Sequence, residues 1–153
     1  MSFYNTQTLP IFTVKDPILS LTKNVLALQS GIVQPITSIV TSNSSVTYTA
    51  EQILNGSIIR YGTTSGVTDT WPSAAEIVSE MEKRLRAIKG QTVSVRIGDN
   101  VPLVIVNRTN DDLDFTGGFN VENDFNSIPS NQARLGQISV IGLNPPKLYV
   151  DGL

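Results

Sequence analysis

The densest cluster of side chains able to bind a metal ion lies at residues 110–114, Asn-Asp-Asp-Leu-Asp. Counted from Asp112, a calcium-binding loop would place Gly117 at its sharp turn. The twelfth position is Asn123, however, where such a loop carries a bidentate glutamate. We therefore favour the lead-in to a hairpin, with acids that keep a sheet edge soluble, over a structural cation. The acids concerned are Asp111, Asp112 and Asp114.

Trp71 is the only tryptophan and stands directly before Pro72. An exposed indole ring at this position would form a platform on which a sugar or a base stacks. A tryptophan beside the start of a helix more often packs across the first turn, and its N–H group finds a buried acceptor. We favour packing and keep ligand stacking by Trp71 as the alternative.

The chain contains no histidine and no cysteine. The sequence therefore excludes catalysis by imidazole or thiolate and the formation of disulfides. It also lacks the usual ligands of zinc, copper, haem and iron–sulfur sites. A catalytic serine would lack its activating histidine, and no phosphate-binding loop or pair of catalytic acids stands out. The sequence predicts a protein that is not an enzyme and that binds no cofactor.

The net charge of the chain argues against a partner that would be bound through long-range electrostatic attraction. The 153 residues hold 11 Lys and Arg against 13 Asp and Glu, a net charge of −2, which gives no long-range attraction to nucleic acid. The most apolar stretch, residues 17–40, is interrupted by polar side chains, so we expect no membrane span. A length of 153 residues and a hydrophobic content of 40% are typical of a single domain that buries a hydrophobic core.

The N-terminal third is rich in apolar residues and almost free of charge. Proline and glycine recur too often there for a long helix. We divide the chain into an extended anchoring segment, residues 1–45, and a β-rich oligomerisation domain, residues 46–153. The alternative is that the segment adds edge strands to the same core. The residues expected to anchor it on another subunit or on a capsid are Ile11, Phe12, Val14, Ile18, Leu19, Leu21, Val25, Leu26, Leu28, Ile32, Val33 and Ile36.

One amphipathic helix is predicted between Ser73 and Gly90. Ser73 and Glu76 have the spacing of a capping box, and Gly90 is placed to end the last turn. Apolar side chains at a 3.6-residue period predict one buried face, and acid–base pairs four residues apart predict an exposed one. The apolar stripe is Ile77, Val78, Met81, Leu85 and Ile88, and the pairs are Glu80–Arg84 and Glu82–Arg86.

After this helix the apolar residues alternate with a period of two, which predicts strands. Residues 93–97 would form a hairpin with 101–106, turning at Asp99-Asn100 and setting Pro102 opposite Ile97. A second hairpin would join residues 113–115 to 119–121 by a three-residue loop with Gly118 in the left-handed conformation. Further strands are expected at 47–49, 57–61, 134–143 and 147–150. The fold class predicted is mainly β, an antiparallel β-sandwich or barrel with one helix.

Three stretches of the sequence carry a resemblance: Thr49-Ala-Glu-Gln-Ile-Leu-Asn-Gly-Ser-Ile-Ile-Arg60, Thr68-Asp-Thr-Trp-Pro-Ser-Ala-Ala75 and Val104-Ile-Val-Asn107. The region from residue 47 to 110 resembles a loosely defined group of virion structural proteins of tailed phages and large DNA viruses. Trp71 stands where a leucine is expected. The resemblance implies a non-enzymatic homotrimeric β protein that decorates, cements or projects from a capsid.

From the resemblance and the composition together we expect a minor capsid or decoration (cement) protein. It would oligomerise, bind the major capsid protein or other virion proteins, and reside in the virion after assembly in the host cytoplasm. The alternative is a fibre-tip or carbohydrate-binding module. Its groove would be lined by exposed aromatic side chains such as Trp71, Tyr48, Tyr61 or Phe125.

Overall fold

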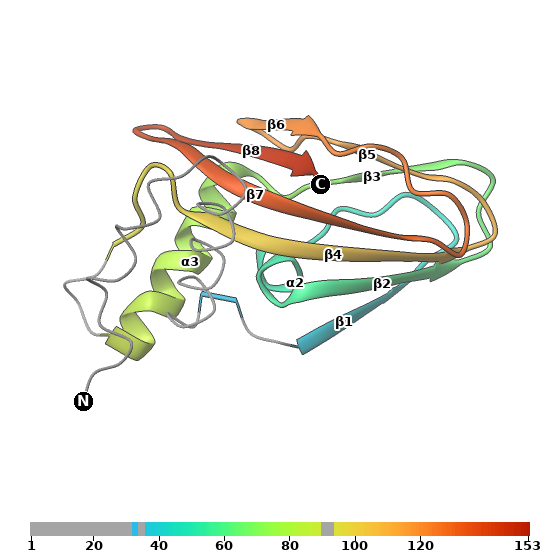
Figure 1. Cartoon of the computed structure of the whole chain (residues 1–153), viewed down its shortest axis with the longest axis horizontal. Helices are drawn as coiled ribbons and strands as arrows, with labels where there is room; N and C mark the ends of the chain where they lie inside the picture. Colours follow the sequence, from blue (N-terminus) through green and yellow to red (C-terminus); the bar gives the residue numbers. More distant parts are fainter. Residues whose placement is uncertain (1–31, 34–35, 90–93) are drawn as a thin grey trace.

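The computed structural model describes residues 32–33, 36–89 and 94–153 (Figure 1). Within these ranges the chain is mainly β, as predicted, and has two helices. The strands are β1 (Ile36–Thr41), β2 (Gly56–Gly62), β3 (Val67–Thr70), β4 (Asn100–Thr109), β5 (Leu113–Thr116), β6 (Val121–Asp124), β7 (Ala133–Leu143) and β8 (Pro146–Gly152). The helices are α2 (Ala50–Leu54) and α3 (Ala74–Lys89).

Six strands form one open sheet in the order β1-β2-β4-β7-β8-β6, and β3 pairs with β5 in a second sheet. The pairs β1/β2, β2/β4, β6/β8 and β3/β5 are parallel, whereas β4/β7 and β7/β8 are antiparallel. The predicted antiparallel arrangement is therefore wrong, and the predicted closure into a barrel is not confirmed. The helices account for two of the parallel pairs, because α2 lies in the connection from β1 to β2 and α3 lies in the connection from β2 to β4.

One face of the large sheet is covered and carries the core. Val101, Leu103 and Ile105 of β4 are buried on this face, while the alternate residues on the other face are only partly buried. Figure 1 shows the two helices toward one end of the long strands and the β3/β5 pair toward the other. Both lie on the covered face, because their buried side chains belong to the same core cluster as those of β4.

Helix α3 begins where its sequence predicts. Glu76 Oε2 accepts hydrogen bonds from the Ser73 backbone N–H at 2.9 Å and from Ser73 Oγ at 2.6 Å, which closes the capping box. Four members of the apolar stripe are buried: Ile77, Val78, Met81 and Leu85. The fifth, Ile88, is 55% exposed, so its predicted burial is wrong. It lies in the last turn, which projects beyond the sheet (Figure 1).

Neither predicted hairpin is present. Pro102 lies opposite Gln137 of β7, not opposite Ile97, and residues 94–96 are not in a strand. Val93 lies outside the described residues. Strand β4 lies between β2 and β7 in the sheet, so neither of its edges is free to pair with residues 94–97.

The second predicted hairpin fails because β5 and β6 belong to different sheets. Asn120, with φ of 59°, takes the left-handed conformation predicted for Gly118. Gly118 is instead required by a close approach: a Cβ there would lie 2.3 Å from the carbonyl oxygen of Trp71. Phe119 is 78% exposed, so it is not the core partner of Phe115.

The strands expected at 57–61, 134–143 and 147–150 are confirmed as β2, β7 and β8. In the segment 47–49 only an isolated bridge from Thr47 to Thr70 forms. Helix α2 was not predicted, although Thr49 and Gln52 form a capping box in which each side chain bonds the other's backbone N–H.

Only the end of the predicted anchoring segment lies within the described residues. Ile32 and Val33 are buried in the chain's own core, so their predicted role as external anchors is wrong. Residues 36–41 form β1, an edge strand of the large sheet, as the alternative interpretation of the segment expects. Ile36 is largely exposed there. The other anchoring residues, Ile11, Phe12, Val14, Ile18, Leu19, Leu21, Val25, Leu26 and Leu28, lie outside the described residues.

Candidate interaction surface

A buried ion pair joins β2 to β3. Arg60 Nε lies 2.8 Å from Asp69 Oδ2, and neither side chain is exposed to solvent. Both residues occupy inward positions of their strands, Arg60 beside Ile58 and Asp69 beside Val67. A charge buried without a partner is costly, so each side chain depends on the other.

The remaining donors and acceptors of this pair are also used. Arg60 donates to the backbone carbonyls of Ser42, Tyr61 and Ser44 at 2.6–2.7 Å. Asp69 accepts from the Val46 N–H at 2.9 Å and from the Tyr48 hydroxyl at 2.6 Å. Burial, followed by the adjacent Asp69 carboxylate, raises the pKa of Tyr48 well above its usual value. The cluster fixes residues 42–48 against β2 and β3, and no atom of the carboxylate faces solvent.

Arg84 forms a second buried cluster, which corrects the prediction that it lies on the exposed face of α3. Its guanidinium donates to the carbonyl oxygen of Leu54 at 2.7 Å, to that of Ile32 at 3.2 Å and to that of Glu51 at 3.3 Å. Arg84 therefore satisfies the last carbonyls of α2, a helix with no basic residue in its own last turn.

Glu80 completes this second cluster. Its Oε1 lies 3.0 Å from Arg84 Nε, as the predicted pairing of the two residues requires. Partial burial would raise the pKa of Glu80, but hydrogen bonds from Arg84 and Lys83 outweigh it and lower the pKa. The other predicted pair, Glu82 and Arg86, is an exposed contact at 3.9 Å.

Trp71 is the centre of an aromatic cluster on the covered face. Its ring stacks on Phe115 at a centroid distance of 5.0 Å and meets Phe125 edge-on at 5.6 Å. The indole N–H donates to Asn123 Oδ1 at 2.6 Å. With 1% of its surface exposed, Trp71 packs as favoured from the sequence, and its ring has no face free to stack on a ligand.

The acidic segment after β4 is a turn that side chains of β4 stabilise. Asn107 Nδ2 and Thr109 Oγ1 each donate to the carbonyl oxygen of Asp111 at 2.8 Å. Asn123, counted as the last position of a calcium loop, bonds Trp71 and the carbonyl of Phe115 instead. Among the described residues no three Asp or Glu side chains converge as a metal site would require.

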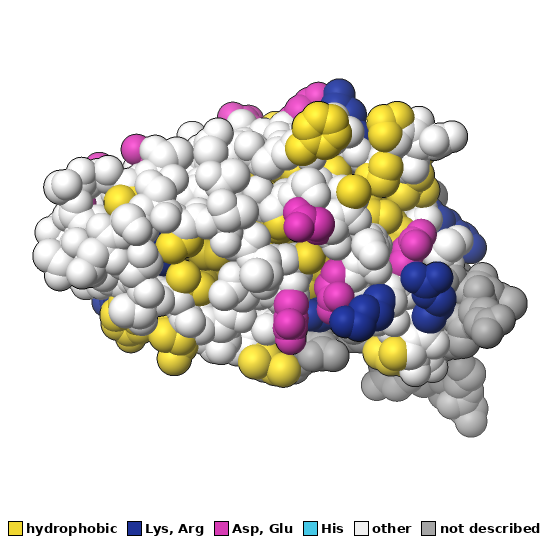
Figure 2. All heavy atoms as spheres, turned by 180° about the vertical axis from the view of Figure 1, so that it is seen from behind, with side chains coloured by type: hydrophobic (Ala, Val, Ile, Leu, Met, Phe, Trp, Pro, Cys, Tyr) yellow, Lys and Arg dark blue, Asp and Glu magenta, His cyan; other side chains and the backbone are white. Residues whose placement is uncertain are grey.

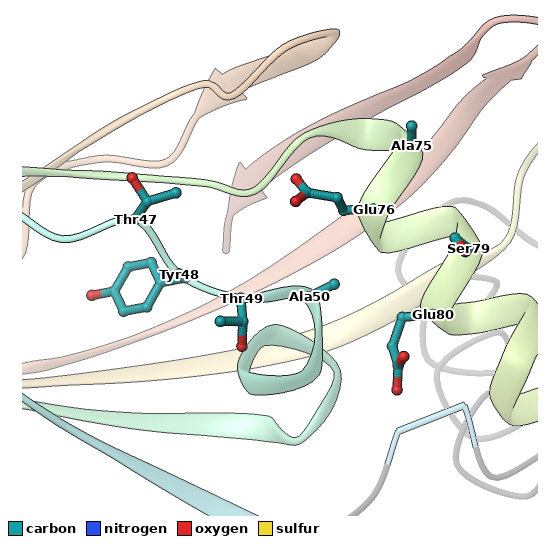
Figure 3. A pocket seen from close by; sticks show the side chains of 8 residues that line it. All are labelled: Thr47, Tyr48, Thr49, Ala50, Ala75, Glu76, Ser79 and Glu80. Atoms are coloured by element: carbon teal, nitrogen blue, oxygen red, sulfur yellow. The ribbon is translucent and has the colours of Figure 1, made fainter.

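A shallow groove of about 600 Å³ lies between residues 47–50 and the first turns of α3 (Figure 3). Hydroxyl groups and carboxylates line it, but the carboxylates of Glu76 and Glu80 already accept bonds from Ser73, Lys83 and Arg84. The ring of Tyr48 points away from α3. The groove thus presents no aromatic face to a sugar.

On the uncovered face of the large sheet, apolar side chains lie next to one another from the β1 edge to the start of β7, and the charged Arg108 lies beside Tyr61 at the end of β4. Ile39, Ile59 and Val106 lie side by side across β1, β2 and β4, and Val104 pairs with Leu135 of β7. Ile39 is 67% exposed and Leu135 is 59% exposed. Figure 2 shows the opposite side of the molecule, where charged side chains gather over α3. We call the uncovered face of the large sheet, together with its β1 edge, the open face.

Comparisons of the chain with protein-family models, with curated proteins and with solved structures gave no match. Among the described residues, no helix combines the length and the apolar character that crossing a membrane requires.

Proposed function

We propose that this chain is a non-enzymatic structural protein of a virion, a minor capsid or decoration (cement) component that oligomerises and binds the capsid shell. The observation that carries the proposal is the open face. Ile39 and Leu135 are more than half exposed on it, beside partly buried Ile59, Val104 and Val106. Exposed apolar side chains that lie next to one another are typical of a contact with another protein, and the centres of such contacts are depleted in charge.

The polar clusters support a structural role. Arg60, Asp69 and Arg84 are buried, and their hydrogen bonds hold together segments distant in the sequence. A catalytic acid or base must reach a substrate, which these groups do not. The virion assignment rests on the resemblance of residues 47–110, a region that includes α2, β2, β3, α3 and β4.

The alternative, a fibre-tip or carbohydrate-binding module, requires a groove lined by exposed aromatic side chains, and most of the side chains expected there are not exposed. Of the four aromatic side chains expected to line it, Trp71, Tyr48 and Phe125 are buried. Tyr61 is exposed at the end of β2 on the open face, away from the other three. One exposed ring is a weak platform for a sugar.

Sedimentation velocity of the full-length chain over a concentration series, together with a glycan array, tests the proposal. We expect a mass above that of the single chain, 16.6 kDa, that increases with concentration, and no glycan binding. A monomer at every concentration contradicts self-association. A monomer that binds glycans would replace the proposal with its alternative.

A further inference from the structure

Strand β1 has an unpaired backbone edge within the described residues. The N–H of Ser42, directly after β1, donates to the carbonyl oxygen of Tyr61 at 3.0 Å. Because N–H and C=O groups of successive strand residues alternate in direction, the even-numbered residues of β1 face β2. The N–H and C=O groups of Thr37, Ile39 and Thr41 therefore point outward from the sheet.

The two edges of the large sheet are protected to different degrees. The β6 edge is four residues long and carries Glu122 and Asp124, which discourage pairing with another acidic edge. The β1 edge is six residues long, Ile-Thr-Ser-Ile-Val-Thr, with no charge, no proline and no register shift in its pairing with β2. An edge without these devices is a template for a further strand.

The outward residues of β1 are symmetric about Ile39, with a threonine two positions away on each side. We propose that β1 pairs antiparallel with β1 of a second copy across a two-fold axis at Ile39. In this register Ile39 faces Ile39 of the second copy, and Thr37 faces Thr41. Every outward N–H and C=O of both strands then has a partner, whereas a shift by two residues leaves some unpaired at the ends. A two-fold contact requires this self-complementarity.

The side chains favour the same register. Ile39, Ile59 and Val106 form a row across three strands, and pairing at Ile39 continues this row into the second copy. Cross-strand pairs of threonine and of branched apolar side chains are stabilising in sheets. Because β1 carries no charge, two identical copies meet there without repulsion between like charges.

This inference rests on the proposed function, which requires that the chain self-associates. It adds that the contact is formed by the β1 edge and that the contact has two-fold symmetry. A two-fold contact joins two copies, so it predicts a dimer where the resemblance implies a trimer. The two sheets would become one continuous sheet, with both open faces on the same side. A shell could then be contacted by twice the apolar surface of a single copy.

Cysteine cross-linking of the full-length chain tests the register, since the natural sequence has no cysteine. Hydrogen-bonded antiparallel neighbours have Cα atoms about 5.5 Å apart, which a disulfide can span. Under mild oxidation we expect Ile39→Cys to give mostly covalent dimer, and a mixture of Thr37→Cys and Thr41→Cys to give the mixed dimer. Leu135→Cys is the matched control and should remain largely unlinked, because Leu135 is also more than half exposed on the open face but lies on β7, three strands away from β1.

Each outcome has a distinct meaning. If Ile39→Cys cross-links no more than Leu135→Cys while the wild-type chain sediments as an oligomer, the β1 contact is wrong and self-association stands. The same result is expected if residues 1–31 cover the β1 edge, and it equally overturns the inference. A wild-type chain that remains monomeric would remove both the contact and the proposed function.

Discussion

Replacing Asp69 with asparagine should lower the free energy of unfolding by about 3–5 kcal/mol, the usual cost of removing one partner from a buried ion pair. The substitution keeps the shape of the side chain and leaves the Arg60 guanidinium, which has no solvent exposure, without its counter-charge. It also weakens the acceptor of the Tyr48 hydroxyl. A domain of this size is stabilised by only about 5–15 kcal/mol, so the loss is a large fraction of the total.

Urea denaturation followed by circular dichroism measures this effect. Asp114→Asn is the matched control, because Asp114 lies opposite Thr68 on the neighbouring strand and is exposed, so it should change stability by less than about 0.5 kcal/mol. In a double-mutant cycle, the variant that combines Arg60→Met with Asp69→Asn should lose less free energy of unfolding than the sum of the losses in the two single variants. Additive losses would show that the two side chains do not depend on each other.

Replacing Trp71 with alanine is expected to cost about 3–5 kcal/mol, the range found when a large aromatic side chain is removed from a core. The cavity would lie between Phe115 and Phe125, which contact the indole ring on different sides. Trp71→Phe separates the two contributions of the side chain. It keeps most of the ring but removes the N–H that bonds Asn123, and we expect a loss of about 1–3 kcal/mol.

Thermal and urea unfolding of the two Trp71 variants give the comparison. Phe119→Ala is the control, since this ring is mostly exposed and its removal should shift stability by less than about 0.5 kcal/mol. A Trp71→Ala protein as stable as the wild type would show that Trp71 does not hold the aromatic cluster together. In that case the indole would again be a candidate for contact with a ligand.

The parts of the fold that depend on local chemistry were predictable. The start of α3 follows from Ser73 and Glu76, and strands β2, β7 and β8 follow from their alternating pattern. Helix α2 was equally accessible, because Thr49 and Gln52 have the same capping-box spacing, but five residues are too few to show a helical period.

The strand pairing was not predictable in the same way, because it depends on contacts between distant residues. Hairpins between sequence neighbours were the simplest assumption, yet β4 pairs with β2 and β7. A signal was available: a helix between two apolar strands is typical of a crossover between parallel neighbours, and α3 lies between β2 and β4.

The buried charges had a weaker signal in the sequence. Asp69 alternates with Val67 and Trp71, and Arg60 alternates with Ile58, so each charge occupies a position where an apolar residue is expected. A pair of such misplaced opposite charges indicates a buried ion pair. The burial of Arg84 has no signal of this kind, because a four-residue spacing from Glu80 also fits an exposed pair, and only the position of α2 shows which carbonyl groups its guanidinium contacts.

The proposed role as a structural protein of a virion is tested most directly by quantitative mass spectrometry of virus particles purified from the source of the chain. We predict that the polypeptide is present in a constant ratio to the shell subunit, and that washing with concentrated salt leaves this ratio unchanged because salt screens contacts between charges and does not weaken apolar contacts. Particles that lack the chain, or that contain it in amounts varying from one preparation to the next, would contradict a structural role in the virion.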